Sequence, residues 1–150
     1  MEAHVLLADA AQSMPDGKVH ALGLGWSNIP TPLPAHAVVI FIKVPWDQTN
    51  RQHSMNIELI DADGQAVTVP GPVGDQALKL EGQFEAGRPA GVEPGTPMDM
   101  ALTFNLAQGL PLGPGRHTWV LTINEDTKDD WRASFTVRPT GRAPSGPGKD

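Results

Sequence analysis

The sequence contains no cysteine. This excludes disulfide bonds and thiolate metal sites, and it suits a reducing compartment. The first residues also lack the basic start of a Sec signal, because Glu2 and Asp9 flank only a short apolar segment. No apolar run approaches the roughly 20 residues that a membrane-spanning helix needs. We therefore expect a cytoplasmic protein that makes no membrane contact.

Positive charge is scarce as well. Lys and Arg number 11 against 17 Asp and Glu, which gives a formal net charge of −6. Because phosphate neutralisation needs clustered Lys and Arg, we expect no nucleic-acid partner. The five histidines show neither an H-x-H pair nor the i, i+4 spacing of a helical zinc site. Gly23-Leu24-Gly25 lacks the third glycine and the helix of a dinucleotide site, so we expect no metal and no cofactor.

Glycine and proline, in contrast, are plentiful: 16 and 15 of the 150 residues, spread between apolar stretches. This spacing is typical of turn-rich sandwiches and barrels. A chain of this length forms one domain and buries about two thirds of its unfolded surface. We expect one domain at 1–138, followed by a disordered Gly/Pro-rich tail at 139–150 that lacks apolar residues.

The strongest pattern spans residues 35–63. Residues 36–44 are apolar on both parities and stop at Pro45, which predicts a buried strand. Residues 55–59 alternate apolar and polar side chains, which predicts a strand with one buried face. We interpret the two as the central long hairpin, closed by an Asp-Gly turn at Asp63-Gly64 rather than by a calcium loop.

Further alternation predicts an all-β fold, an immunoglobulin-like β-sandwich of about eight or nine strands. Gly23 and Gly25 indicate a bulge or a close backbone approach within the second strand. Residues 86–97 are expected to form the longest surface loop. The remaining strands are expected at 4–11, 18–26, 65–69, 77–85 and 98–106, with a final hairpin that pairs 119–123 with 131–137.

Several motifs also carry a resemblance to a known family. They include GRPAGVEPGTPMDMALTFNL, LPLGPGRHTWVLTI, VPWDQTNRQH and ELIDADGQAV, and together they lie within residues 5–137. They are similar to an uncharacterised family of small bacterial proteins common in actinobacteria. The resemblance implies a β-sandwich and no catalytic residue. The segment around His117 also resembles the corner of immunoglobulin-like domains, where many members carry tyrosine.

The best candidate for recognition is the polar loop at 45–53. Trp46 would offer an apolar platform, and Arg51 a forked donor to a carboxylate or phosphate. The alternative is structural: Trp46 covers the open end of the sandwich, and Asp47 and Asn50 hydrogen-bond the turn backbone. Asp47 could equally pair with Arg51.

We therefore expect a non-catalytic binding or assembly module, with a protein partner or self-association, because rigid β scaffolds carry recognition on their loops. The expected contact residues lie at one end of the domain: Trp46, Asp47, Asn50, Arg51, His53 and Arg88.

Two other functions stay open. A small hydrolase would use His53 or His117 with a nearby acid, Asp47 or Asp99, within hydrogen-bond reach. A structural component of a phage or secretion assembly would instead show a long unpaired edge strand or a tail buried by a neighbouring copy.

Overall fold

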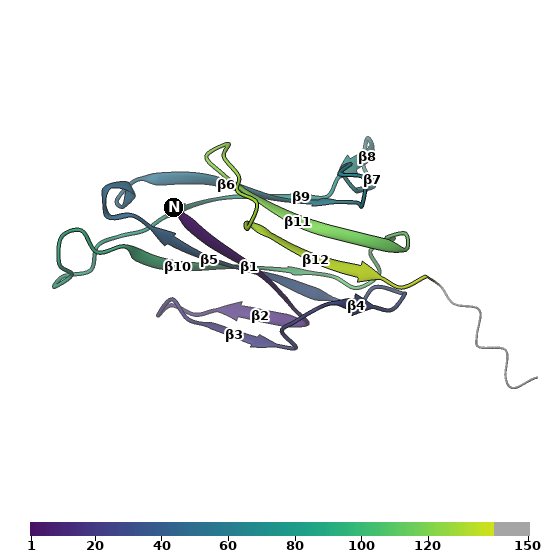
Figure 1. Ribbon diagram of the computed structural model, residues 1–150, viewed down its shortest axis with the longest axis horizontal. Helices are drawn as coiled ribbons and strands as arrows, with labels where there is room; N and C mark the ends of the chain where they lie inside the picture. Colours follow the sequence, from purple (N-terminus) through teal and green to yellow (C-terminus); the bar gives the residue numbers. More distant parts are fainter. Residues whose placement is uncertain (140–150) are drawn as a thin grey trace, which may run out of the picture.

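The computed structural model describes residues 1–139, which are built almost wholly from β-strands. Figure 1 shows two main layers and a separate hairpin on the far side of one of them. The three-stranded sheet has the order β1-β5-β10 and is antiparallel throughout. Its strands are β1 (Glu2–Ala8), β5 (His36–Val44) and β10 (Met98–Leu106).

The five-stranded sheet has the order β4-β12-β11-β6-β9. All its neighbours are antiparallel except β4 and β12, which pair in parallel over two residues. Its strands are β4 (Asn28–Ile29), β12 (Arg132–Val137), β11 (Gly115–Ile123), β6 (Gln52–Ile60) and β9 (Lys79–Glu85).

The expected central hairpin is wrong. Both arms form strands, but β5 pairs with β1 and β10, whereas β6 pairs with β11 and β9. The intervening loop contains a short 3₁₀ helix, η1 (Trp46–Gln48), and carries the chain from one sheet to the other. Packed sheets lie about 10 Å apart, which a loop of this length spans. Apolar pattern alone gives no information on which strand receives the backbone hydrogen bonds.

The core lies between the two sheets. Alternate side chains of β6 and β11 point into it, as the sequence predicts: Met55, Ile57, Leu59, Trp119, Leu121 and Ile123 are all buried. On the opposite sheet Val38, Ile40, Ile42 and Val44 of β5 face them and are fully buried. Complete burial of a large apolar side chain stabilises the fold by about 1.5–3 kcal/mol, so the buried side chains of β5, β6 and β11 dominate the packing.

The separate hairpin covers only part of the outer face of the three-stranded sheet. It consists of β2 (Ala10–Ser13) and β3 (Val19–Leu22). Ala11 is buried against Ala37 and Val39 of β5. The amide of Asn105 holds the hairpin in place, because Nδ2 donates to the Ala11 carbonyl at 2.9 Å and Oδ1 accepts from the Ala11 N–H at 3.3 Å.

The all-β prediction is confirmed, and the immunoglobulin-like character of the sandwich stays a prediction. Residues 1–139 form twelve strands instead of eight or nine, because a short unpredicted strand, β4, forms and the predicted strands at 4–11 and 77–85 each divide in two. The second of these divisions creates a small hairpin of β7 (Thr68–Gly71) and β8 (Gly74–Ala77). The predicted tail at 139–150 lies outside the described residues, apart from Pro139.

The predicted turn at Asp63-Gly64 is confirmed, whereas the expectation at Gly23 is corrected. Oδ1 of Asp61 accepts the N–H groups of Asp63 and Gln65, and Gly64 adopts a φ of 78°. The carboxylate therefore closes a turn. Gly23 has a φ of 66°, and a β-carbon there would collide with the side chain of Asp9. The close neighbour of Gly23 is therefore the Asp9 side chain, and not the backbone that the sequence led us to expect.

Candidate functional site

The loop at 45–53 is held by its own residues and by Arg88. The Thr49 hydroxyl donates to the Trp46 carbonyl at 2.7 Å and accepts from Nε of Arg88. Nη2 of Arg88 also donates to the Trp46 carbonyl, and the guanidinium lies 3.8 Å from the centroid of the Trp46 ring. One edge and one face of this cation are therefore occupied within the chain, which assigns Arg88 and Trp46 a structural role.

His53 is buried below this loop. Its Nε2 lies 2.7 Å from the Gln48 carbonyl, and its Nδ1 lies 2.8 Å from Nδ2 of Asn124. Oδ1 of Asn124 accepts from the Ser54 N–H, so the amide nitrogen is the donor to His53. Nδ1 is then an acceptor, and the ring proton sits on Nε2 and is donated to Gln48. Sequence reasoning missed Asn124, because its contact with β6 joins residues about 70 positions apart.

The other predicted contact residues are exposed. Asp47, Asn50 and Arg51 all lie at the surface, and Asp47 and Arg51 form no ion pair within residues 1–139. The backbone of Asn50, at a φ of 59°, donates to the Ala86 carbonyl. Thr49, and not the side chains of Asp47 and Asn50, hydrogen-bonds the turn. The structure therefore separates the six predicted residues into a structural group and an exposed group.

The histidine–carboxylate pairs of the hydrolase hypothesis do not form among the described residues. His53 bonds an amide and a carbonyl. His117 is buried, its Nδ1 lies 3.1 Å from the Gly115 carbonyl, and its ring stacks on Phe135. Asp99 instead pairs with Lys43 at 3.2 Å. Neither imidazole is placed to exchange a proton with an acid.

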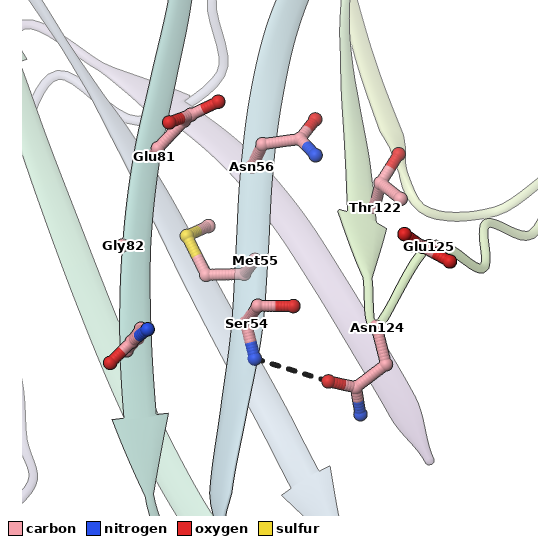
Figure 2. A pocket seen from close by; sticks show the side chains of 9 residues that line it. Ser54, Met55, Asn56, Glu81, Gly82, Thr122, Asn124 and Glu125 are labelled. Carbon is pink, nitrogen blue, oxygen red and sulfur yellow. Dashed lines mark hydrogen bonds between the residues drawn. The ribbon is translucent and has the colours of Figure 1, made fainter.

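A polar hollow of about 440 Å³ lies on the five-stranded sheet (Figure 2). Figure 2 shows β9, β6 and β11 side by side, with amide, hydroxyl and carboxylate groups above them. Asn124 is already bonded to Ser54 at its edge. Its polar lining side chains are Ser54, Asn56, Glu81, Gln83, Thr122, Asn124 and Glu125, and Met55 and Gly82 complete the lining. No aromatic side chain lines this hollow, so an apolar ligand gains little there.

A more apolar groove of about 660 Å³ opens on the other sheet, beside the β2–β3 hairpin. Phe41 of β5 lies in it with 38% of its surface exposed. Val19 of β3 and Met100 of β10 line it as well, and His4 lies opposite Phe41 in the ladder. The hairpin covers Val39 but stops short of Phe41, so one aromatic ring of the outer row faces solvent.

Charged side chains surround this groove. Lys43 and Asp99 line it and form an ion pair at 3.2 Å, and Glu2 and Lys18 also line it. A second depression of about 450 Å³ shares Gly17, Asp99 and Met100 with the groove and extends to Arg88. The two depressions therefore adjoin each other at the hairpin tip, and the second one reaches the edge of the loop predicted for recognition.

His36 is a buried polar residue that sequence reasoning passed over. Its Nε2 accepts from Nε1 of Trp119 at 3.3 Å, while Nδ1 has no hydrogen-bond partner within the described chain. Trp26 and Phe135 pack against the ring at 4.7 and 5.9 Å between centroids. Trp26 therefore lies at the start of β5 and Trp46 after its end, roughly 25–30 Å apart along an extended strand. Trp26 and Trp46 therefore do not form a joint apolar patch.

Fold and surface together define a small all-β protein of two packed sheets with an apolar groove beside a covering hairpin. The chain belongs to a Family of unknown function (DUF6941), whose model matches residues 3–138. No curated protein matches the chain. The predicted membership of an uncharacterised family is thus confirmed, and its bacterial, actinobacterial origin stays a prediction. Within residues 1–139 no helix has the length and hydropathy to cross a membrane.

Proposed function

We propose that this protein is a non-catalytic binding module, and that it holds a segment of another protein in the groove around Phe41. The observation that supports the proposal is that the β2–β3 hairpin covers only part of the apolar outer row of β5. The outer row of β5 is apolar through Ala37, Val39 and Phe41, yet the β2–β3 hairpin buries only the first two. The exposed Phe41 then supplies an apolar anchor site for a partner.

The composition of the groove favours a protein segment as the occupant. An apolar floor surrounded by charges of both signs is the usual anatomy of a protein interface. Lys43 and Asp99 satisfy each other, whereas Lys18 and Glu2 form no ion pair in the described part of the chain. The complementary ligand is therefore an extended segment with one large apolar side chain, flanked by an acidic and a basic residue.

The exposed residues of the predicted contact end extend this surface. Arg88 lines the second depression, and its loop adjoins Asp47, Asn50 and Arg51. These three exposed side chains would add polar contacts at the end of the bound segment and so contribute to its orientation. In this proposal the loop at 45–53 forms the polar rim of the binding surface. Phe41, and not Trp46, is the apolar anchor.

The test is a comparison of two exposed apolar positions. Proteins retained from the native host by the wild-type chain are identified, purified and titrated by calorimetry. We expect Phe41→Glu to weaken the binding of the cognate protein at least tenfold, since buried aromatic anchors dominate interface energies. Val73→Glu makes the same kind of change at a site that is 93% exposed in the β7–β8 turn, and should leave the affinity unchanged. Equal affinities for the wild type and Phe41→Glu would refute the groove as the site.

A structural role in a larger assembly is the second candidate. It is favoured by the edges of the two sheets: β9 and β10 are each the last strand of their sheet. The inward-facing Leu80 of β9 and Met100 and Leu102 of β10 are only half-buried. Long unpaired strands of this kind were the feature expected of an assembly component.

A further inference from the structure

The β9 strand leaves one whole edge of the five-stranded sheet open. It pairs with β6 along its whole length, from Lys79 opposite Glu58 to Glu85 opposite Gln52. It pairs with no other strand of the described chain. The Leu78 carbonyl accepts the N–H of Leu59, so the even-numbered residues of this strand direct their backbone groups toward β6. By alternation, the backbone N–H and C=O groups of Lys79, Glu81, Gln83 and Glu85 point away from β6, along the plane of the sheet. The open edge thus offers a regular row of donors and acceptors.

Of the usual devices that prevent pairing, this edge carries charged side chains but neither a proline nor an inward-pointing charge. Exposed edges are commonly blocked by a proline, by an inward-pointing charge or by a cover. Residues 79–85 contain no proline, and the inward positions are Leu80, Gly82 and Phe84. The charges of β9 lie only on the outer face of the sheet. An additional strand would therefore meet no buried charge.

The charged side chains of β9 complement each other when β9 is placed against the β9 of a second copy in antiparallel orientation. With Gly82 at the symmetry axis, Lys79 stands opposite Glu85 of the second copy, and Glu81 opposite Gln83. The register therefore adds two Lys–Glu pairs to the Lys79–Glu81 ion pair of 3.4 Å within each copy, and it opposes no like charges directly. Opposite charges across an antiparallel pair are stabilising, whereas like charges are destabilising.

We propose that two copies of this chain associate through their β9 edges and form one continuous sheet across the dimer. The backbone N–H and C=O groups of Glu81, which point away from β6, form the hydrogen bonds next to the axis with those of Gln83 in the second copy. Gly82 directs its own groups toward β6, so the two central glycines form a non-hydrogen-bonded pair. Such pairs bring the two Cα atoms closest together, about 4.5 Å apart, and glycine has no side chain to oppose this approach.

The proposal gives the assembly candidate a specific contact and does not depend on the groove. Phe41 lies on the three-stranded sheet, whereas β9 ends the other sheet. Phe41→Glu should therefore leave dimer formation unchanged. A failure of groove binding and a failure of β9 pairing are then separate results.

The experiment exchanges the paired charges and measures mass by sedimentation up to millimolar concentration. We expect Lys79→Glu and Glu85→Lys each to weaken the dimer at least about tenfold, since each change creates two like-charge pairs. A mixture of the two variants restores dimers, because all the opposed charges in the heterodimer are then opposite in sign. The double variant Lys79→Glu/Glu85→Lys also dimerises.

Rescue in the mixture is the decisive outcome, because misfolding of either variant would not be repaired by adding the other. Thermal melting of each variant confirms that the single chains fold. The proposal is overturned when the wild type stays monomeric at millimolar concentration. It is equally overturned when the single variants dimerise like the wild type, or when the mixture stays monomeric.

Discussion

The indole Nε1 of Trp119 donates a hydrogen bond to Nε2 of His36, with 3.3 Å between the two nitrogens. The bond joins β11 to β5 and thus links the two sheets through the core. Because Nε2 accepts, the proton of the neutral ring lies on Nδ1, which has no partner among the described residues. Burial lowers the pKa of His36 to about 4, and the Pro34 backbone opposes this shift only in part.

The first prediction concerns stability against acid. The pKa of His36 is lower in the folded chain than its usual value of 6.5, so the unfolded chain binds more protons between these values. The free energy of unfolding should therefore fall as the pH drops from 6.5 to about 4, by up to about 3 kcal/mol. Urea unfolding across this range measures it. His36→Phe should flatten the slope, whereas His20→Phe, at an exposed position, should not; equal slopes would contradict the assignment.

The second prediction separates the two roles of Asn124. Its side chain bonds Ser54 and His53, and its φ of 50° favours asparagine or glycine. Asn124→Gly keeps the backbone conformation and removes the amide, which should cost about 1–3 kcal/mol. Asn124→Ala adds backbone strain and should be the less stable of the two. Denaturant titration gives the order, and an Asn124→Gly variant as stable as the wild type would show that His53 does not need this contact.

The third prediction distinguishes Arg88 from Arg51. Arg88 donates to Thr49 and Trp46 and lies over the indole, so Arg88→Ala should lower the free energy of unfolding by about 1–2 kcal/mol. Arg88→Lys should not restore it, because an ammonium group lacks the planar fork. Arg51→Ala should change stability by less than about 0.5 kcal/mol. Equal effects at both positions, in the same unfolding assay, would count against the structural role of Arg88.

The fourth prediction compares two phenylalanines. Phe84 is 4% exposed and stacks on His53, so Phe84→Ala should cost about 3–5 kcal/mol. Phe41→Ala should cost less than about 1 kcal/mol, since its ring already faces solvent. Melting curves test both values. A large loss for Phe41→Ala would mean that this ring supports the fold and is not reserved for a partner.

Strand positions could be predicted because side-chain alternation is a local property. The patterns at 36–44, 98–106 and 119–123 correspond to β5, β10 and the end of β11. The final hairpin of β11 and β12 pairs as predicted, because its arms adjoin in sequence. The partners of β5 could not be predicted, because β5 bonds strands that lie far from it in sequence. The same apolar run would fit a hairpin arm or, as observed, the centre of a three-stranded sheet.

The candidate site was harder to predict than the fold. The loop at 45–53 contains suitable chemical groups, but Arg88 and Asn124 reach it from distant segments and occupy Trp46 and His53. The groove depends on how far the β2–β3 hairpin extends over the sheet, which no local pattern reports. One signal was present: Phe41 lies on the second apolar parity of β5, just before Lys43 interrupts it.

The most direct test of the groove proposal is photo-crosslinking from position 41. The chain carries a benzophenone amino acid there, or at exposed position 73 as the matched control, and is irradiated in its native host. We predict one discrete protein adduct from position 41, suppressed by excess wild-type chain but not by Phe41→Glu chain, and no such adduct from position 73. No adduct from position 41, or the same adducts from both positions, would contradict the proposed binding site.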